Sequence, residues 1–175
     1  MTVAAFFQAL TNLFRPNGPV CPECGSHILA REDGSPRKAS ADHCPNLDCP
    51  TKIAVWILHW CSPEIMDIPA MDHDLAGQLA KRRMVQHMGE LYRFGPGDWE
   101  SLDGMSGDHC DRLLEQFQAS LKKQTAVVLV GMCIPGVGAE LSQRLLEWFK
   151  TVDGIRGTRP CELVQVEGVT EAAAR

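Results

Sequence analysis

The chain has 175 residues, of which 45% are hydrophobic and 22% charged, a composition typical of a soluble globular protein. Seventeen Lys and Arg stand against 22 Asp and Glu, which gives a net charge of −5. That sign excludes a protein that binds nucleic acid by bulk attraction to phosphate, so any such site must be local. The length suits one ordinary domain or two small ones, and no apolar run is long enough to span a membrane.

Residues 1–19 begin with an apolar pattern at helical spacing and end in a proline- and glycine-rich stretch. The residues on one predicted helical face are Val3, Phe6, Phe7, Leu10, Leu13 and Phe14. The sequence Pro-Asn-Gly-Pro over residues 16–19 ends this helix. We therefore expect an apolar N-terminal helix and a linker, with the helix docking on the rest of the protein or on a partner.

Two closely spaced cysteine pairs follow, Cys21-Pro-Glu-Cys24 and Cys44-Pro-Asn-Leu-Asp-Cys49, separated by the spacer 25–43. Prolines and glycine around both pairs favour tight turns, and a tetrahedral zinc ion with Zn–S distances of about 2.3 Å requires two thiolates from each turn. The spacing predicts a four-cysteine zinc finger over residues 20–60, with a structural ion. A pair of disulfides or a redox Cys-x-x-Cys motif is the alternative. Zinc is favoured because no signal peptide directs the chain to an oxidising compartment.

The other four cysteines are scattered among apolar neighbours, which leads us to expect reduced, mostly buried thiols in a cytoplasmic protein. They are Cys61, Cys110, Cys133 and Cys161. A helix is predicted from Ile53, with a break at Cys61 and an N-cap at Ser62 that places Pro63 first in the next helix. Helices with short glycine-bearing turns then succeed one another, and only residues 125–130 are predicted to form a strand.

Three blocks of this region repeat one order at regular intervals along the chain: apolar residues, a glycine turn and a helix. Their turns are Gly104-Met105-Ser106-Gly107, Gly136-Val137-Gly138 and Gly168-Val169-Thr170. This order is typical of helix-hairpin-helix motifs, in which the glycines allow tight geometry and leave amide N–H groups at the next helix N-terminus. A phosphate oxygen can bind there without base specificity.

We therefore predict a mainly α fold, with an all-α tandem helix-hairpin-helix domain over residues 61–175. The predicted DNA contacts are Gly136, Val137 and Gly138, helped by Gly104, Ser106 and Gly107. One alternative is an all-α bundle whose glycine turns serve packing alone. Another is a nucleotide-binding loop fed by a strand at residues 126–130. It is disfavoured because the third glycine of the dinucleotide fingerprint is missing and no alternating strands surround the segment.

A zinc finger followed by tandem hairpins resembles the C-terminal region of bacterial NAD-dependent DNA ligase. The similar segments are Cys21–Gly25, His43–Lys52, His59–Ser62, Ile65–Ile68, Leu91-Tyr92 and Leu102–Met105. The likeness runs from about Cys21 to Arg175. It implies binding of duplex or nicked DNA through backbone phosphates, in replication or repair, and a separate subunit for adenylation and the OB-fold.

The sequence also departs from that family. The adenylation lysine of its Lys-x-Asp-Gly motif has no counterpart: the nearest string, Lys150-Thr-Val-Asp153-Gly154, has one residue too many and is interpreted as a helix end. We expect no catalytic residue, no NAD binding by this chain and no activity of the chain alone. The fourth hairpin is expected to be truncated.

The hairpin glycines are also incomplete. Ala70-Met71-Asp72 stands at the first hairpin, and Ser106 and Thr170 replace second glycines, so only the third hairpin is intact. Two hypotheses remain open. The chain is a DNA-binding module, or it is a degenerate ligase-like paralogue that serves as a protein-interaction module.

Overall fold

The computed structural model describes residues 19–28 and 43–174 and divides the chain into two compact units, residues 1–53 and 54–175. The predicted helix over residues 3–14 and the predicted loop over residues 31–41 lie outside the described residues. No helix in the described part of the chain is both long and apolar enough to cross a membrane.

The first unit is built from two tight turns that carry the cysteine pairs. In the first turn, the Gly25 amide donates to the Cys21 carbonyl at 2.9 Å, and Gly25 adopts a positive φ of 71°. A single antiparallel bridge between Val20 and His27 closes this turn. In the second, the Asp48 amide donates to the Asn46 side chain at 3.0 Å. Both turns therefore hold their cysteines through hydrogen bonds of the backbone amides.

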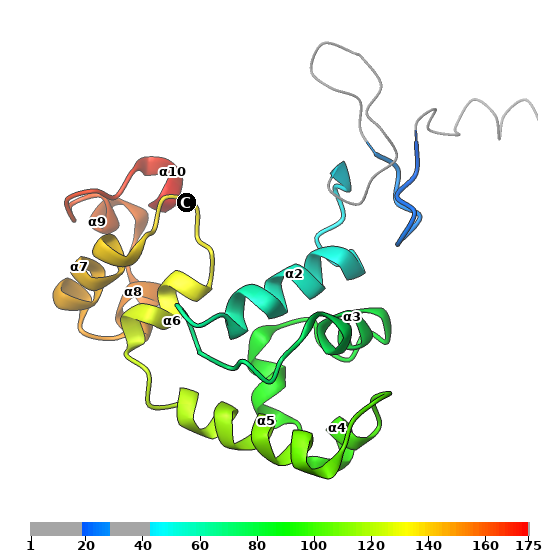
Figure 1. Cartoon of the computed structure of the whole chain (residues 1–175). Coiled ribbons are helices and arrows are strands. Elements are labelled where there is room, and N and C mark those ends of the chain that lie inside the picture. The colour runs from blue at the N-terminus through cyan, green and yellow to red at the C-terminus, as the bar shows by residue number, and fades with distance from the viewer. Residues whose placement is uncertain (1–18, 29–42, 175) are drawn as a thin grey trace, which may run out of the picture. The chain divides into compact units, whose positions relative to one another are not determined.

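The described residues form helices and no strand, which confirms the mainly α prediction. The helices are α2 (Pro50–Cys61), α3 (His73–Lys81), η2 (Met88–Arg93), α4 (Pro96–Glu100), α5 (Gly107–Ser120), α6 (Thr125–Gly131), α7 (Ala139–Phe149), α8 (Val152–Gly157), α9 (Pro160–Leu163) and α10 (Glu171–Ala174) (Figure 1). Helix α2 begins earlier than predicted, at Pro50 instead of Ile53, because proline is favourable in a first helical turn.

Two local predictions are wrong. Residues 125–130 form helix α6 instead of a strand, because α6 packs along α7 and buries Leu129, and this packing outweighs the low helix propensity of its valines. Ser62 does not cap a helix. Its carbonyl instead accepts from the amides of Ile65 and Asp67 at 3.1 and 2.9 Å, so a turn separates α2 from α3.

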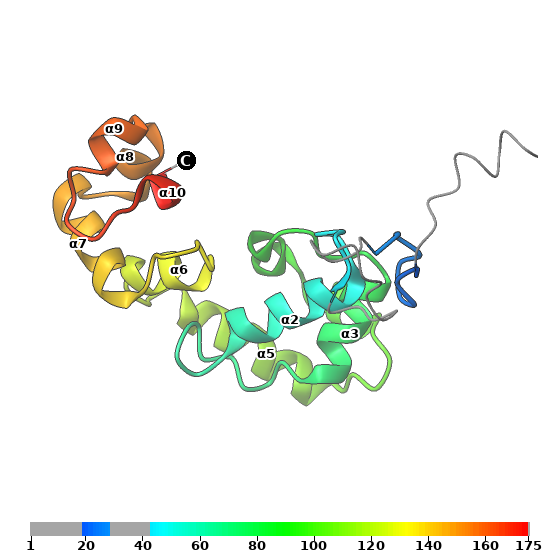
Figure 2. The ribbon, with the colours of Figure 1, turned by 90° about the horizontal axis from the view of Figure 1, so that it is seen from above.

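Among its described residues, the second unit contains an aromatic cluster and an aliphatic cluster. Trp99 is fully buried and stacks on Phe117 at a centroid distance of 5.6 Å, with the Tyr92 ring edge-on to Phe117. The aliphatic cluster is formed by Leu141 and Val166 with their apolar neighbours, in the part of the unit built from α7 to α10 (Figure 2). These clusters fix the turns between the helices.

The second-unit cysteines divide into two classes. Cys61 and Cys110 are buried, as predicted, but Cys133 and Cys161 are exposed, so the prediction of mostly buried thiols holds for half of them. Cys133 follows the end of α6 with a positive φ of 53°, and Cys161 lies on the short helix α9. An apolar sequence neighbourhood therefore does not bury these two side chains.

Candidate metal centre and candidate nucleic-acid interface

The sulfur atoms of Cys21, Cys24, Cys44 and Cys49 lie within 4.8 Å of one another. Sγ of Cys21 is 3.8 Å from Sγ of Cys49, and Sγ of Cys24 is 3.4 Å from Sγ of Cys44. Four thiolates around a zinc ion at about 2.3 Å have sulfur–sulfur separations of about 3.8 Å, so the cluster fits a tetrahedral ion. All four cysteines are free, and these separations far exceed a disulfide bond of about 2.05 Å.

The environment of the thiols also fits a metal ion. Cys21, Cys44 and Cys49 are buried, and Ile28 packs against them. The side-chain hydrogen bond with Ser26 lowers the pKa of Cys24 to about 6, whereas burial raises the pKa of Cys44 to about 12. A bound divalent cation reverses this preference of Cys44 for the neutral form, because coordination deprotonates the thiol outright. All four thiols can therefore hold one metal ion, with no position left open for water.

Four turns of the second unit correspond to the predicted hairpins, and the three that contain glycine share one backbone conformation. We name the four the first (residues 70–72), second (104–107), third (136–138) and fourth (168–170) turns. Gly104, Gly136 and Gly168, which are evenly spaced along the chain, adopt positive φ angles of 78°, 81° and 94°. Residues with a side chain rarely adopt a positive φ, so each of these turns requires glycine. This requirement explains the glycine repeat in the sequence.

The four turns differ in the residue that begins the following helix. The Asp72 carboxylate accepts from the Leu75 amide at 2.8 Å, and the Ser106 hydroxyl accepts from the His109 amide at 3.3 Å. In the fourth turn, the Thr170 hydroxyl accepts from the Ala173 amide at 3.2 Å. Gly138, the N-cap residue of α7, provides no side-chain cap. Among these turns, the third alone therefore leaves the amides of its helix N-terminus without a competing side-chain acceptor.

The first turn is closed by a second set of contacts. The Ala70 amide donates to the side chain of Gln116 at 2.9 Å, and the Ala70 carbonyl lies 2.8 Å from the His109 ring nitrogen. Both partners come from α5. The backbone of this turn is thus occupied within the protein, in addition to the carboxylate that caps α3.

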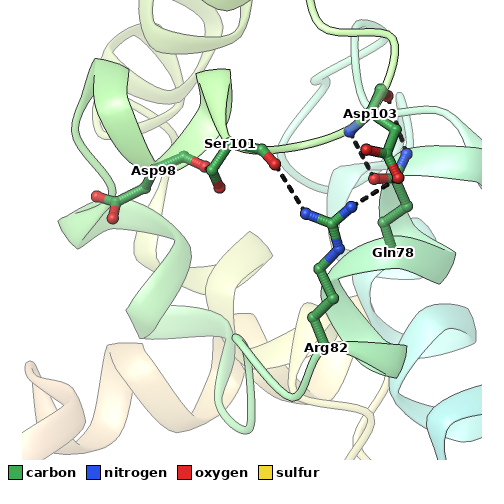
Figure 3. A network of polar contacts seen from close by, with 5 residues as sticks. All are labelled: Gln78, Arg82, Asp98, Ser101 and Asp103. Carbon is green, nitrogen blue, oxygen red and sulfur yellow. Dashed lines mark hydrogen bonds and ion pairs between the residues drawn. The ribbon is translucent and has the colours of Figure 1, made fainter.

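Basic side chains near the turns are engaged with acidic ones. Arg82 donates to the Asp103 carboxylate at 2.6 Å and to the Ser101 carbonyl at 2.7 Å, and Gln78 bonds both backbone groups of Asp103 (Figure 3). Arg144 pairs with Glu140 at 2.6 Å. Because Arg82 compensates Asp103, the second turn is less negative than its sequence indicates. The sequence carried no signal for this contact, since η2 and α4 separate its partners along the chain.

The residues predicted to contact DNA are placed at the surface. Gly136 and Gly138 are exposed, as are Gly104, Ser106 and Gly107, and Val137 is partly buried. The residues of the second unit include 12 Lys and Arg against 17 Asp and Glu, so all of the excess negative charge falls there. Any phosphate contact must therefore rest on backbone amides more than on a basic surface.

No family model matches the chain. The DNA ligases of Synechococcus sp. (strain JA-3-3Ab) and Koribacter versatilis are each 33% identical to it, over 149 and 150 residues. Each match covers 85% of this chain and 21% of the ligase. The DNA ligase of Syntrophobacter fumaroxidans is 30% identical over 155 residues, 89% of this chain and 22% of its own length.

This chain resembles one part of DNA ligases. The matches confirm the resemblance that the cysteine and glycine motifs indicated. The chain spans about a fifth of the length of these curated relatives. The resemblance therefore describes a ligase-derived module and carries no activity of the whole ligase to this chain.

Proposed function

We propose that the chain is a DNA-binding module that holds duplex DNA around a nick through backbone phosphates, in DNA replication or repair. The observation that carries the proposal is the third turn, where the N-cap residue of α7, Gly138, provides no side-chain cap. The free amides of a helix N-terminus bind an anion, and the helix dipole adds a partial positive charge of about half a unit. In this proposal the four turns are helix-hairpin-helix motifs.

Gly136, Val137 and Gly138 form the main contact, and the second turn adds Gly104, Ser106 and Gly107. Gly136 permits the positive φ that brings the chain back into α7, and an added Cβ at Gly138 would meet no atom within 4 Å. A phosphate oxygen can therefore approach the Gly138 backbone closely. Such contacts read no base, so binding is indifferent to sequence.

The four-cysteine cluster holds structural zinc in this proposal, because a closed set of four thiolates is the donor set that zinc prefers. Cys21, Cys24, Cys44 and Cys49 would keep the two turns of the first unit together. The metal supplies folding free energy to these two turns, whose buried cluster contains only Ile28 besides the cysteines. It has no part in a reaction, since all four positions are filled by protein.

We assign no catalytic residue to this chain and propose that adenylation, with its NAD and OB-fold, comes from a separate subunit in the cytoplasm. Lys150, the lysine nearest to the family motif in sequence, is the C-cap of α7 and is exposed. Mass spectrometry after incubation with NAD and Mg²⁺ is expected to find no AMP on the protein. An AMP adduct at Lys150 would contradict this assignment.

The DNA contact is tested with the zinc-loaded full chain and a labelled nicked duplex over a series of salt concentrations. The wild type should bind at low salt, with a shallow dependence that reports a few phosphate contacts. Gly138→Asp should abolish binding by placing a carboxylate at the anion site. Gly97→Asp is the matched control, because Gly97 is exposed, has open space for a side chain and lies on α4. Equal binding by wild type and Gly138→Asp would contradict the proposed contact.

A protein-interaction module is the second candidate function. It is favoured by the negative charge of the second unit and by the side-chain caps on three of the four turns. Wild-type protein that binds no nicked duplex at any salt concentration would support this candidate and reject the first.

A further inference from the structure

A cavity of about 320 Å³ opens in the second unit between α2, the segment before η2 and the end of α6. Trp56 and Trp60 line it from α2, one helical turn apart. Met132, the residue directly after α6, lines it as well. Gln86, His87 and Met88 complete most of the rim. None of its lining residues is Lys, Arg, Asp or Glu.

One wall of the cavity is fixed in place. The Trp60 indole N–H donates to the Tyr92 hydroxyl at 3.2 Å, which in turn lies 3.0 Å from the Ser120 hydroxyl. On the other side, Trp60 packs so closely on α6 that a Cβ at Gly131 would lie 2.9 Å from its ring. Trp60 is 7% exposed, whereas Trp56 is 45% exposed. The cavity is thus lined by one indole that is held by packing and a hydrogen bond, Trp60, and by one exposed indole, Trp56.

The chemistry of the lining selects a planar, uncharged, weakly polar group. Indole faces stack on aromatic rings of any base, and methionine side chains adapt to irregular outlines. Within the described part of the chain, the Gln86 side-chain amide has no hydrogen-bond partner, so it offers both a donor and an acceptor to a ring edge. A glutamine amide is the group that bonds adenine in a bidentate way.

The size also discriminates between occupants. A volume of about 320 Å³ is at the lower limit of small-molecule sites, which suits one nucleoside-sized group better than the successive anchors of a bound helix. The position adds to this, because Met132 closely precedes Gly136 of the third turn in the chain. The proposal therefore requires that a nucleotide whose neighbouring phosphate is held at the third turn place its base in this cavity.

We propose that this cavity binds the base of one unpaired nucleotide, stacked on Trp56. The inference rests on the proposed function, because the third turn would hold the adjoining backbone. The base pocket would give the protein a preference for DNA with an unpaired nucleotide, whereas the phosphate contact alone does not distinguish between DNA structures or sequences. Gln86 would favour adenine over pyrimidines.

The test uses the zinc-loaded full chain and two nicked duplexes that differ in one position. One carries an unpaired adenosine at the nick, and the other an abasic tetrahydrofuran there. The wild type should bind the adenosine duplex at least about fivefold more tightly, as expected for stacking of one base. Trp56→Ala should remove the difference and leave affinity for the abasic duplex unchanged. Trp148→Ala is the control, because Trp148 is 60% exposed on α7 and does not line the cavity.

Equal wild-type affinity for the two duplexes would overturn the base pocket while leaving the phosphate contact intact. If neither duplex binds, the proposed function fails, and free 2-aminopurine riboside then decides the pocket alone. Quenching of its fluorescence by wild type but not by Trp56→Ala supports a base site, and no quenching overturns it. Binding of a Leu- and Phe-rich peptide in place of the riboside would also overturn it, in favour of a protein side chain as occupant.

Discussion

Gln78 and Arg144 occupy equivalent positions in two copies of one arrangement. Each is the sixth residue after the N-cap of its helix, α3 or α7. Gln78 donates to the Asp103 carbonyl at 3.0 Å and Arg144 to the Glu167 carbonyl at 3.2 Å. Both acceptors directly precede a positive-φ glycine. The first and second turns therefore pair as the third and fourth do, with the earlier helix of each pair holding the later turn.

Removal of the Gln78 amide should loosen the second turn. Gln78 also accepts from the Asp103 amide at 2.8 Å, so Gln78→Ala loses two hydrogen bonds and is expected to lower the free energy of unfolding by about 1 kcal/mol. Gln143→Ala on α7 is the matched control, because Gln143 is exposed and makes no side-chain hydrogen bond among the described residues. Urea unfolding followed by tryptophan fluorescence measures both. Equal losses would show that the Gln78 bonds contribute nothing.

Two glycine-to-alanine substitutions should change stability in opposite directions. A Cβ at Gly131 would lie 2.7 Å from Ile65 Cγ2, so Gly131→Ala forces Ile65 and Trp60 away from α6 and should cost about 1 kcal/mol, even after the gain in helix propensity. Gly77→Ala lies within α3 with open space around it and should raise stability by about 0.5–1 kcal/mol. Thermal unfolding distinguishes them, and stabilisation by both would contradict the close packing of Trp60 on α6.

Thiol reactivity should divide the eight cysteines into three classes. In zinc-loaded protein, Cys133 and Cys161 should react quickly with a chromogenic disulfide reagent at mildly alkaline pH because they are exposed. Burial raises the pKa of Cys61 to about 12, so this buried thiol should stay unreactive, as should Cys110, whose pKa burial also raises.

A chelator should then add four reactive thiols, those of the metal cluster, while releasing one zinc ion per chain. Cys44→Ser, which removes one ligand, should give protein without zinc that shows the remaining cluster thiols as reactive from the start. Four additional thiols without released zinc would mean that the cluster holds another metal, and cluster thiols that react before the chelator is added would mean that it holds none.

Features that depend on local requirements were predictable from the sequence, and those that depend on distant contacts were not. The cysteine spacing indicated the cluster, and the positive φ of Gly104, Gly136 and Gly168 left a visible repeat. The β-branched side chains of residues 125–130 have a high β propensity and therefore predict a strand. Packing against α7 outweighs this propensity, and the segment forms a helix. The Trp56 cavity and the Arg82–Asp103 pair join segments that are distant in the chain, which no periodicity reveals.

If free N-terminal amides make the third turn the main phosphate contact, removal of a cap elsewhere should create a further contact. Ser106→Gly releases the His109 amide at the start of α5 and, because glycine is a tolerated N-cap, should cost only a few tenths of a kcal/mol. Affinity for nicked duplex should rise, and the slope of log K against log salt should steepen by less than the roughly 0.9 that a full positive charge on one phosphate gives, because a helix N-terminus carries about half a unit of charge.

Thr151→Gly is the control for this effect. Thr151 caps α8 through the Gly154 amide at 3.0 Å in the same way, but it lies outside the four turns. Its loss should lower stability by a comparable amount and leave the salt slope unchanged. An unchanged slope for Ser106→Gly, or an equal change for both variants, would show that the cap at the second turn does not limit access of phosphate. The prediction that a released helix N-terminus at the second turn binds phosphate would then be wrong, and the free amides of the third turn would be the remaining support for the proposed contact.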